Sequence, residues 1–212
     1  MVELDDLTTV AQDYVKVIWT STEWGEPPIT TTGLAARLGT SAPNVSETLR
    51  RLAGQGLVSY EPYRPVQLTP AGERLALAMV RRHRLIETFL AEVVGYGWDE
   101  VHDEAERLEH AVSDQLLARM DALLGNPDRD PHGHQIPGPD GALPVVGPTA
   151  RRLSECPPGH YRVVEVSDAD GPVLAELAAL GVAPGALVAA DLPPPQLREA
   201  IWVVPVEPGG RS

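Results

Sequence analysis

Apolar residues recur at helical spacing in several stretches of this chain. In residues 8–23 the apolar positions, such as Tyr14 and Ile18, lie one turn apart and predict an amphipathic helix. Residues 98–124 carry a longer apolar stripe that Gly125 terminates. We expect one continuous helix there, with a face suited to packing or dimerisation.

Four elements are predicted between these two helices. The first is a short helix over Gly33–Leu38, capped by Thr31 or Thr32, and the second is a helix capped by Ser41, with Pro43 in its first turn and Gly54–Gly56 as its stop. A two-stranded hairpin over residues 57–69 follows, and then a helix from Thr69 to about Val94. This order is typical of a winged helix-turn-helix. A generic small α/β fold that uses the same elements is the alternative.

The pattern changes after the second long helix. Residues 126–147 are dense in proline and glycine, which predicts a linker or extended arm that is not packed. Residues 148–212 then combine three alternating strands with one short helix, as in a small β-barrel. We therefore predict a mainly α fold with small β parts (α+β), divided into a winged helix-turn-helix domain at 1–74, a helical domain with its arm at 75–147 and a third domain at 148–212.

Charge adds a candidate partner to this outline. The chain of 212 residues has a net charge of −13, but residues 27–84 hold eight arginines against Glu47, Glu61 and Glu73. A local basic block can attract phosphate within an acidic chain, so we expect double-stranded DNA as a partner. No apolar run is long enough for a membrane span, the acidic N-terminus does not resemble a secretory signal, and the lone Cys156 fits a reducing cytoplasm.

The helix that begins at Ser41 would be the reader in the major groove. Its exposed polar side chains are candidates for contact with bases and phosphates, and arginines near it and on the wing could reach phosphates. The candidate residues are Ser41, Pro43, Asn44, Ser46, Glu47, Thr48, Arg50, Arg51 and Arg64. An ordinary solvated helix face is the alternative interpretation of Arg50 and Arg51.

Histidine and carboxylate side chains gather in VHDEAERLEH, residues 101–110. On a helix His102, Glu106, Glu109 and His110 fall within an arc of about 100°. Neighbouring carboxylates repel one another, so a cation is expected there. His83 and Glu87 repeat the arrangement at i, i+4, and Asp13 on the first helix could add a further ligand.

Imidazole and carboxylate together suit divalent manganese, iron, cobalt or zinc. An acidic solvated helix with incidental histidines is the alternative to this metal site. The remaining histidines, His132, His134 and His160, fall in the arm and the third domain, and we expect them not to be ligands.

The chain resembles the diphtheria toxin repressor family of metal-activated transcription factors along essentially its full length. The segments that carry the resemblance are DYVKVIW (13–19), TSAPNVSETLRRL (40–52), LTPAGERLA (68–76), RRHRLIETFL (81–90), VHDEAERLEH (101–110) and PHGHQIPGPDG (131–141). The third domain is similar to the SH3-like (FeoA-like) domain of longer members. The resemblance implies a cytoplasmic, homodimeric repressor of metal-homeostasis genes that binds a palindromic operator and is not an enzyme.

The resemblance also implies two metal sites. The primary site would use Asp13, Glu106, Glu109 and His110, and the secondary site His83, Glu87, His102 and Asp170, with Asp168 as the alternative acid. Iron-dependent members have methionine and cysteine where this chain has Asp13 and Glu106. These oxygen ligands favour Mn(II) as co-repressor, with Fe(II) as the alternative and Co(II) or Zn(II) as substitutes in vitro.

One departure from the family changes the expected number of ions. Short manganese regulators carry a glutamate one turn after the aspartate, and this chain has Lys16 at that place. A cation there disfavours a close two-metal cluster, so we expect two separated sites. A metal bridging Asp13 to the helix of Glu106 would then fix the spacing of two DNA-binding domains.

Two other classes of protein remain open at this point. A metal-dependent hydrolase would need an open coordination position and a substrate cleft, and the chain has no HExxH or similar pattern. A metal-independent winged-helix regulator that senses a small ligand would have no use for the histidine and carboxylate clusters.

Overall fold

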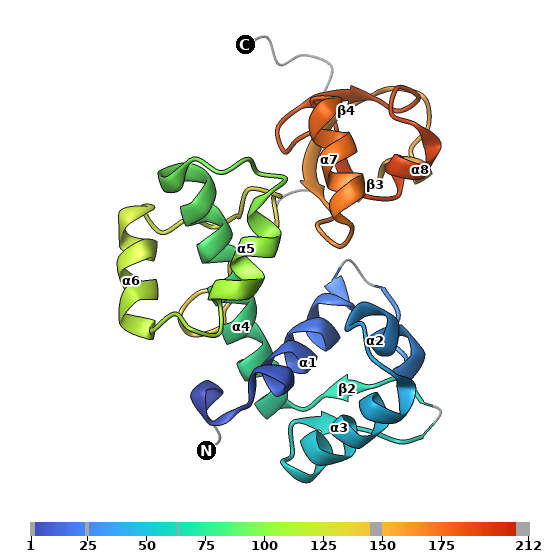
Figure 1. The fold of residues 1–212 in the computed structure, drawn as a ribbon. Coiled ribbons are helices and arrows are strands. Elements are labelled where there is room, and N and C mark those ends of the chain that lie inside the picture. The colour runs from blue at the N-terminus through green and yellow to red at the C-terminus, as the bar shows by residue number, and fades with distance from the viewer. Residues whose placement is uncertain (1–2, 24–25, 63, 145–149, 207–212) are drawn as a thin grey trace. The chain divides into compact units, whose positions relative to one another are not determined.

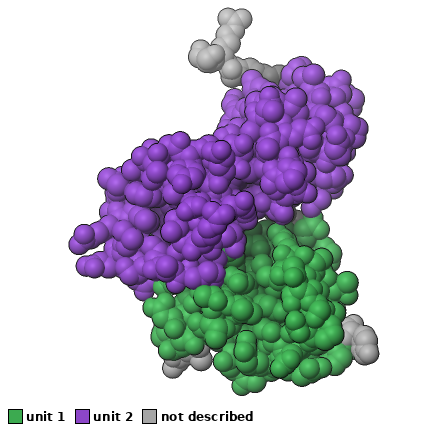
Figure 2. Space-filling model, viewed as in Figure 1, with its two compact units in different colours: residues 1–82, 137–142 green, residues 83–136, 143–212 purple. Residues whose placement is uncertain are grey.

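A computed structural model describes residues 3–23, 26–62, 64–144 and 150–206. The chain divides into two compact units, residues 1–82 with 137–142 and residues 83–136 with 143–212 (Figure 2). Most of the ordered structure is helical, with two small antiparallel sheets, so the expected α+β class is confirmed. Among the described residues, no helix has the length and apolar character needed to cross a bilayer.

The first unit has the element order expected of a winged helix-turn-helix (Figure 1). Its elements are the 3-10 turn Leu4–Asp6, α1 (Thr9–Thr20), α2 (Thr31–Arg37), α3 (Ala42–Gly54), β1 (Val58–Ser59), β2 (Gln67–Leu68) and the first part of α4 (Pro70–Phe89). The hairpin pairs Val58 with Leu68 and Ser59 with Gln67. Tyr63, in the connection between these strands, lies outside the described residues.

Local sequence explains where these helices begin. Ser41 accepts a hydrogen bond from the amide of Asn44 and starts α3 as expected, with proline in the first turn. The cap of α2 is Thr30, one residue before the predicted Thr31, because its side chain accepts from the amide of Gly33. Apolar faces of the helices then meet in one core whose fully buried members include Val15, Leu34, Val45, Leu49 and Leu52.

The second unit holds the remaining helices and the larger sheet. After α4 a single π-helical turn covers Leu90–Val94, and the later elements are α5 (Val101–Leu108), α6 (Asp114–Leu123), β3 (Arg151–Arg152), the 3-10 turn Leu153–Glu155, β4 (His160–Val166), α7 (Gly171–Ala179), β5 (Leu187–Ala189), α8 (Pro195–Arg198) and β6 (Ile201–Pro205). The strand order β3-β6-β4-β5 is antiparallel throughout. This sheet is open, with β3 and β5 at its edges, whereas we expected a barrel.

The single helix expected over residues 98–124 is wrong. The structure has two helices, because Ser113 accepts a hydrogen bond from the amide of Leu116 and starts α6 afresh. Leu117 on α6 packs with Leu85 and Ile136, and α5 packs through Val101 and Ala105. The apolar stripe is thus shared between two short helices that each have their own contacts with α4.

The first turn of α4 packs against the backbone at Leu57, just before the first strand of the wing, and this close approach allows a test. A methyl group on Gly72 would lie 2.0 Å from the carbonyl oxygen of Leu57, which already accepts a hydrogen bond from the amide of Thr69. Gly72→Ala should therefore lower the free energy of unfolding by about 1–3 kcal/mol or more, measured in urea. Gly54→Ala is the control, since nothing lies within 4 Å of the added methyl. Equal stability of the two variants would contradict this packing.

Candidate metal centre

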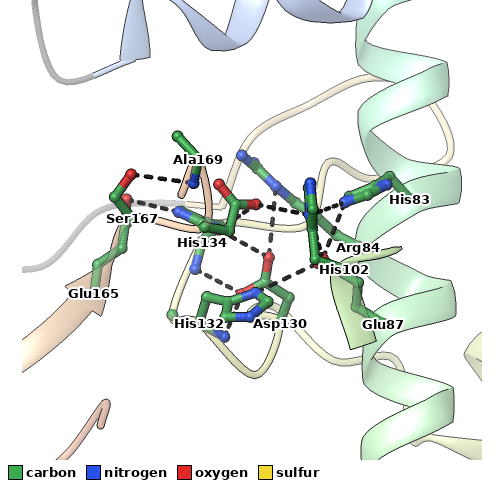
Figure 3. Close-up of polar contacts among 12 residues, drawn as sticks. His83, Arg84, Glu87, His102, Asp130, His132, His134, Glu165, Ser167 and Ala169 are labelled. Carbon is green, nitrogen blue, oxygen red and sulfur yellow. Dashed lines mark hydrogen bonds and ion pairs between the residues drawn. The ribbon is translucent and has the colours of Figure 1, made fainter. Parts of the chain in front are cut away.

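Two helices of the second unit bring three predicted ligands together around one carboxylate oxygen (Figure 3). Helix α4 presents His83 and Glu87 one turn apart, and α5 presents His102. Glu87 Oε1 lies 2.9 Å from His83 Nε2 and 3.2 Å from His102 Nδ1, and these two nitrogens are 3.2 Å apart. Glu87 is fully buried, so the three atoms meet where water does not reach the carboxylate.

This arrangement fits a divalent cation. An imidazole nitrogen that is not protonated carries a lone pair, and here two imidazole nitrogens and a carboxylate oxygen face one another. Such atoms repel unless a proton or a metal ion lies between them. Imidazole and carboxylate are also the donors that divalent transition metals accept. The residues predicted for the secondary site therefore suit a metal ion in type and in spacing.

A fourth carboxylate comes from the segment after β4. Asp168 Oδ2 lies 3.6 Å from His102 Nδ1, and Asp168 offers an oxygen within 4.8 Å of the ligand atoms of His83, Glu87 and His102. Asp170, the first choice from the sequence, is exposed and accepts a hydrogen bond from the amide of Val173 as the cap of α7. The structure therefore brings Asp168, the alternative from the sequence, to the cluster, whereas Asp170 caps α7.

The second nitrogen of His83 faces residues predicted for the primary site. His83 Nδ1 lies 2.7 Å from Glu109 Oε2 and 3.8 Å from Glu106 Oε1. His110 Nε2 lies 3.6 Å from Glu109 Oε1. Metal-bound histidines commonly donate their other N–H to a carboxylate, which fixes the orientation of the ring. Glu109 is placed to orient His83 in this way.

The acids and histidine of the primary set come from different local structures. Glu106 lies on α5, whereas Glu109 ends that helix and His110 follows it in a turn, so the expected arc on one continuous helix is incomplete. Asp13 lies half-buried on α1, in the first compact unit, and Lys16 is buried on the same helix.

A loop that we expected to be unpacked contributes two further buried histidines. Asp130 Oδ1 accepts hydrogen bonds from the amides of His132 and His134, so the carboxylate closes the loop on itself. The amide of Val166 donates to the carbonyl of His132, which fastens the loop to β4. The expectation of an unpacked arm is therefore wrong for this stretch, whereas residues 145–147 of that arm lie outside the described residues.

Each ring of the loop has its own polar surroundings. His134 lies between two carboxylates, 3.1 Å from Asp130 Oδ2 and 3.3 Å from Glu165 Oε1. Arg84 on α4 holds the loop by donating to the carbonyl of Gln135. Sequence reasoning missed this cluster because it treated Pro and Gly content as decisive. The Asp-x-His-x-His spacing was the available signal, since an aspartate often bonds backbone amides two residues on.

The pKa values of the buried acids and histidines are shifted mainly by burial and by one another's charges. Burial alone would raise the pKa of Glu87, but His83, His102 and His132 outweigh it and hold that pKa well below the ordinary value. Burial lowers the pKa of His134, yet Asp130 and the other acids raise it well above the ordinary value. Without a metal ion, the histidines themselves supply the positive charge that the buried acids require.

The predicted DNA-reading residues lie along α3 and at the hairpin. Most of them are exposed: Ser41, Pro43, Asn44, Glu47, Arg50, Arg51 and Arg64. Ser46 and Thr48 are half-buried, and Ser46 Oγ accepts a hydrogen bond from the hydroxyl of Tyr60. Arg64 forms an exposed ion pair with Glu61 at 3.2 Å. The structure leaves most of the polar face of α3 open to solvent.

Comparison with known proteins supports both the DNA-binding and the metal-binding interpretation. Residues 6–66 match the iron dependent repressor, N-terminal DNA binding domain, and residues 69–138 match the iron dependent repressor, metal binding and dimerisation domain. The iron-dependent repressor IdeR of Mycobacterium leprae is 33% identical over 204 residues, covering 90% of this chain and 87% of that protein. The diphtheria toxin repressor of Corynebacterium diphtheriae is 39% identical over 171 residues, covering 78% and 75%.

Solved structures give the same result over most of the chain. A manganese-dependent transcriptional repressor in complex with manganese has a TM-score of 0.83 and 47% identity, covering 92% of this chain and 100% of that one. The manganese regulator SloR has a TM-score of 0.75 and 28% identity, covering 92% and 98%.

The fold and the buried centre thus define a class, the metal-dependent transcriptional repressors that bind DNA through a winged helix-turn-helix. Within that class, the chain belongs to the iron-dependent repressor family that includes the diphtheria toxin repressor. The resemblance on which the sequence interpretation relied is confirmed.

The loop at the centre allows a matched test. Gly133 has a φ of +90°, and an added methyl would lie 2.1 Å from the carbonyl oxygen of Val164. Gly39 also has a positive φ, +59°, but its methyl would meet nothing within 4 Å. Both alanine variants should lose about 1 kcal/mol of stability through backbone strain, and Gly133→Ala about 2 kcal/mol more through the clash. Urea unfolding measures both; similar losses would show that the loop does not depend on this close approach.

Proposed function

We propose that this protein is a manganese(II)-activated repressor of metal-homeostasis genes that binds a palindromic operator as a homodimer. The observation that carries the proposal is the convergence of His83 Nε2 and Glu87 Oε1, on the helix that starts at the wing, with His102 Nδ1 from α5. A bound divalent cation supplies the positive charge that holds these donors together. Iron(II) is the alternative co-repressor.

The choice of manganese rests on the ligand types at two positions. Asp13 and Glu106 offer oxygen where the iron-dependent members of the family offer sulfur, and oxygen donors suit manganese. The similar structure of a manganese-dependent transcriptional repressor in complex with manganese supports the same choice. Availability in the cell also governs which metal is bound, so the ligands favour manganese without excluding cobalt or zinc in vitro.

We propose two metal sites for this function. The primary site uses Asp13, Glu106, Glu109 and His110, as the family resemblance implies. The secondary site uses His83, Glu87 and His102, with Asp168 in place of Asp170 as the acid from the C-terminal domain, because only Asp168 lies within ligand spacing of the other three.

The chain's own residues would transmit metal binding to DNA. Without a cation, the carboxylates of the primary set repel one another, which disfavours the arrangement of α1 that metal binding needs. Metal binding would favour the arrangement of α1 in which all the primary ligands reach one ion. Metal affinity and DNA affinity are then linked, because both depend on that arrangement. DNA contact would then come from α3 and the wing, with Ser41, Pro43, Asn44, Ser46, Glu47, Thr48, Arg50, Arg51 and Arg64 as the proposed contact residues.

The dimer would form through the helices of the second unit. Leu116 and Leu123 on α6 and Leu108 on α5 are large apolar side chains left exposed in the single chain. Large exposed apolar surfaces commonly mark protein interfaces, so these side chains are our candidates for the dimer contact. We keep the division into domains at 1–74, 75–147 and 148–212, and a cytoplasmic location follows from the role on DNA. Family members are repressors, so we propose no catalytic residues.

Loss of one primary ligand should uncouple metal from DNA. We expect Asp13→Ala to lower operator affinity in the presence of Mn(II) at least about tenfold, toward the metal-free level, because the acids on α5 lose their partner on α1. Fluorescence anisotropy with an operator selected from random duplexes measures this. Asp103→Ala, an exposed acid on α5 outside the ligand set, should retain activation. Undiminished activation of Asp13→Ala would contradict the primary site.

Phosphate contacts should appear in the salt dependence of operator binding. Arg50→Ala and Arg51→Ala should each make the slope of log affinity against log salt concentration shallower by about one per chain, hence about two for a dimer. Arg151→Ala on β3, an exposed arginine outside both the proposed DNA contacts and the proposed dimer surface, should leave the slope unchanged. An unchanged slope in both test variants would show that these arginines lie on a solvated face.

A further inference from the structure

His132 has one ring nitrogen satisfied and one that faces a carboxylate without a hydrogen bond. Its Nε2 lies 2.8 Å from the carbonyl oxygen of Trp98. A carbonyl oxygen can only accept, so Nε2 carries the proton and Nδ1 of the neutral ring bears a lone pair. The ring is fully buried, and Figure 3 shows it beside Glu87 in the same polar cluster.

The atom that faces this lone pair is the second oxygen of Glu87. His132 Nδ1 and Glu87 Oε2 are 3.6 Å apart, and neither has a hydrogen-bond partner among the described residues. Both side chains are 0% exposed. Buried polar atoms are almost always partnered, so this unpartnered pair indicates that positive charge, from a proton or from a metal ion, belongs between the two atoms.

The separation distinguishes a proton from a metal ion. A charge-assisted hydrogen bond between nitrogen and a carboxylate brings the two atoms to about 2.7–2.9 Å. Two ligands of one metal ion, each about 2.1 Å from it, lie roughly 3–3.5 Å apart. The observed 3.6 Å is closer to the second arrangement.

The same loop holds two further side chains with donor atoms, Asp130 and His134, which already contact each other, since His134 Nδ1 lies 3.1 Å from Asp130 Oδ2. Asp130 and His134 each offer an atom within 4.8 Å of a ligand atom of His132. His134 already has a carboxylate at each ring nitrogen. Asp130 Oδ1 is used by backbone amides, and Arg84 Nε stands 3.6 Å from Oδ2 as the competing cation.

We propose that Glu87 bridges two divalent cations in this protein. Its Oε1 would belong to the secondary site with His83 and His102, and its Oε2 would bind a second ion with His132, with Asp130 as a further donor. This inference rests on the proposed secondary site, and it makes His132 a ligand, contrary to the expectation from sequence. It does not involve the two-metal cluster that Lys16 disfavours, which would form near Asp13.

Manganese itself is the probe for this pair. The full-length protein would be saturated with Mn(II), freed of excess metal, and analysed for manganese content and by low-temperature electron paramagnetic resonance. A carboxylate that binds one ion through each of its oxygens keeps two manganese ions within a few ångströms, so their unpaired electrons are magnetically coupled. We expect about three ions per chain in the wild type, with a coupled-pair signal.

The variant that tests the ligand is His132→Gln. Its amide nitrogen can still donate to the carbonyl of Trp98, while no atom replaces Nδ1. It should bind about one ion fewer per chain and lose the coupled signal. His160→Gln, an exposed histidine at the start of β4, is the matched control and should keep both.

Three results would overturn the proposal: a wild-type protein with no coupled signal, a His132→Gln variant that keeps the full manganese content and the signal, or equal losses in His160→Gln. If His132→Gln does not fold by circular dichroism, the wild-type spectrum alone decides. Failure of the proposed function would appear elsewhere, as operator binding that does not respond to Mn(II).

Discussion

A fully buried carboxylate at Glu87 is the constraint around which the metal-binding part of this protein is built. An ionised acid removed from water is costly unless positive charge or hydrogen-bond donors reach it. Here α4, α5 and the loop at residues 130–134 each place an imidazole beside it. The position of each of those three segments is therefore tied to the same group, so any change in the positive charge beside Glu87 acts on all of them at once.

Helix α4 connects the segment that carries Glu87 with the winged-helix domain. It begins at Pro70, directly after the second strand of the wing, and carries His83 and Glu87 near its other end. Its first turns pack against the winged-helix core through Leu75, Ala76 and Met79, while Leu85 and Ile86 pack with the helices of the second unit. One continuous helix thus takes part in both the DNA-binding domain and the metal centre, as a metal-dependent repressor requires.

Local signals in the sequence were sufficient for the winged helix and for the candidate ligands that come together from α4 and α5. Helix caps such as Ser41 and the i, i+4 spacing of His83 and Glu87 act over one turn, so a short stretch of sequence contains all that determines them. The break before α6 was missed because the apolar stripe continues across Ser113 and gives no hint of the cap. Long-range packing decided the rest: only the fold shows that residues 130–134 are buried against β4, and that Asp168 instead of Asp170 approaches His102.

In the proposed secondary site, Asp168 comes from the C-terminal domain and His83, Glu87 and His102 from the helices before it, so the domain would act as a tethered ligand. Its carboxylate is present at an effective concentration set by the connecting chain and not by the solution. Metal occupancy at the proposed site and docking of that domain would then be a single linked equilibrium. A truncated chain that ends before β3 would keep the histidines but lose this chelate advantage, so sensitivity to the metal could be tuned by changing the connection without altering any ligand.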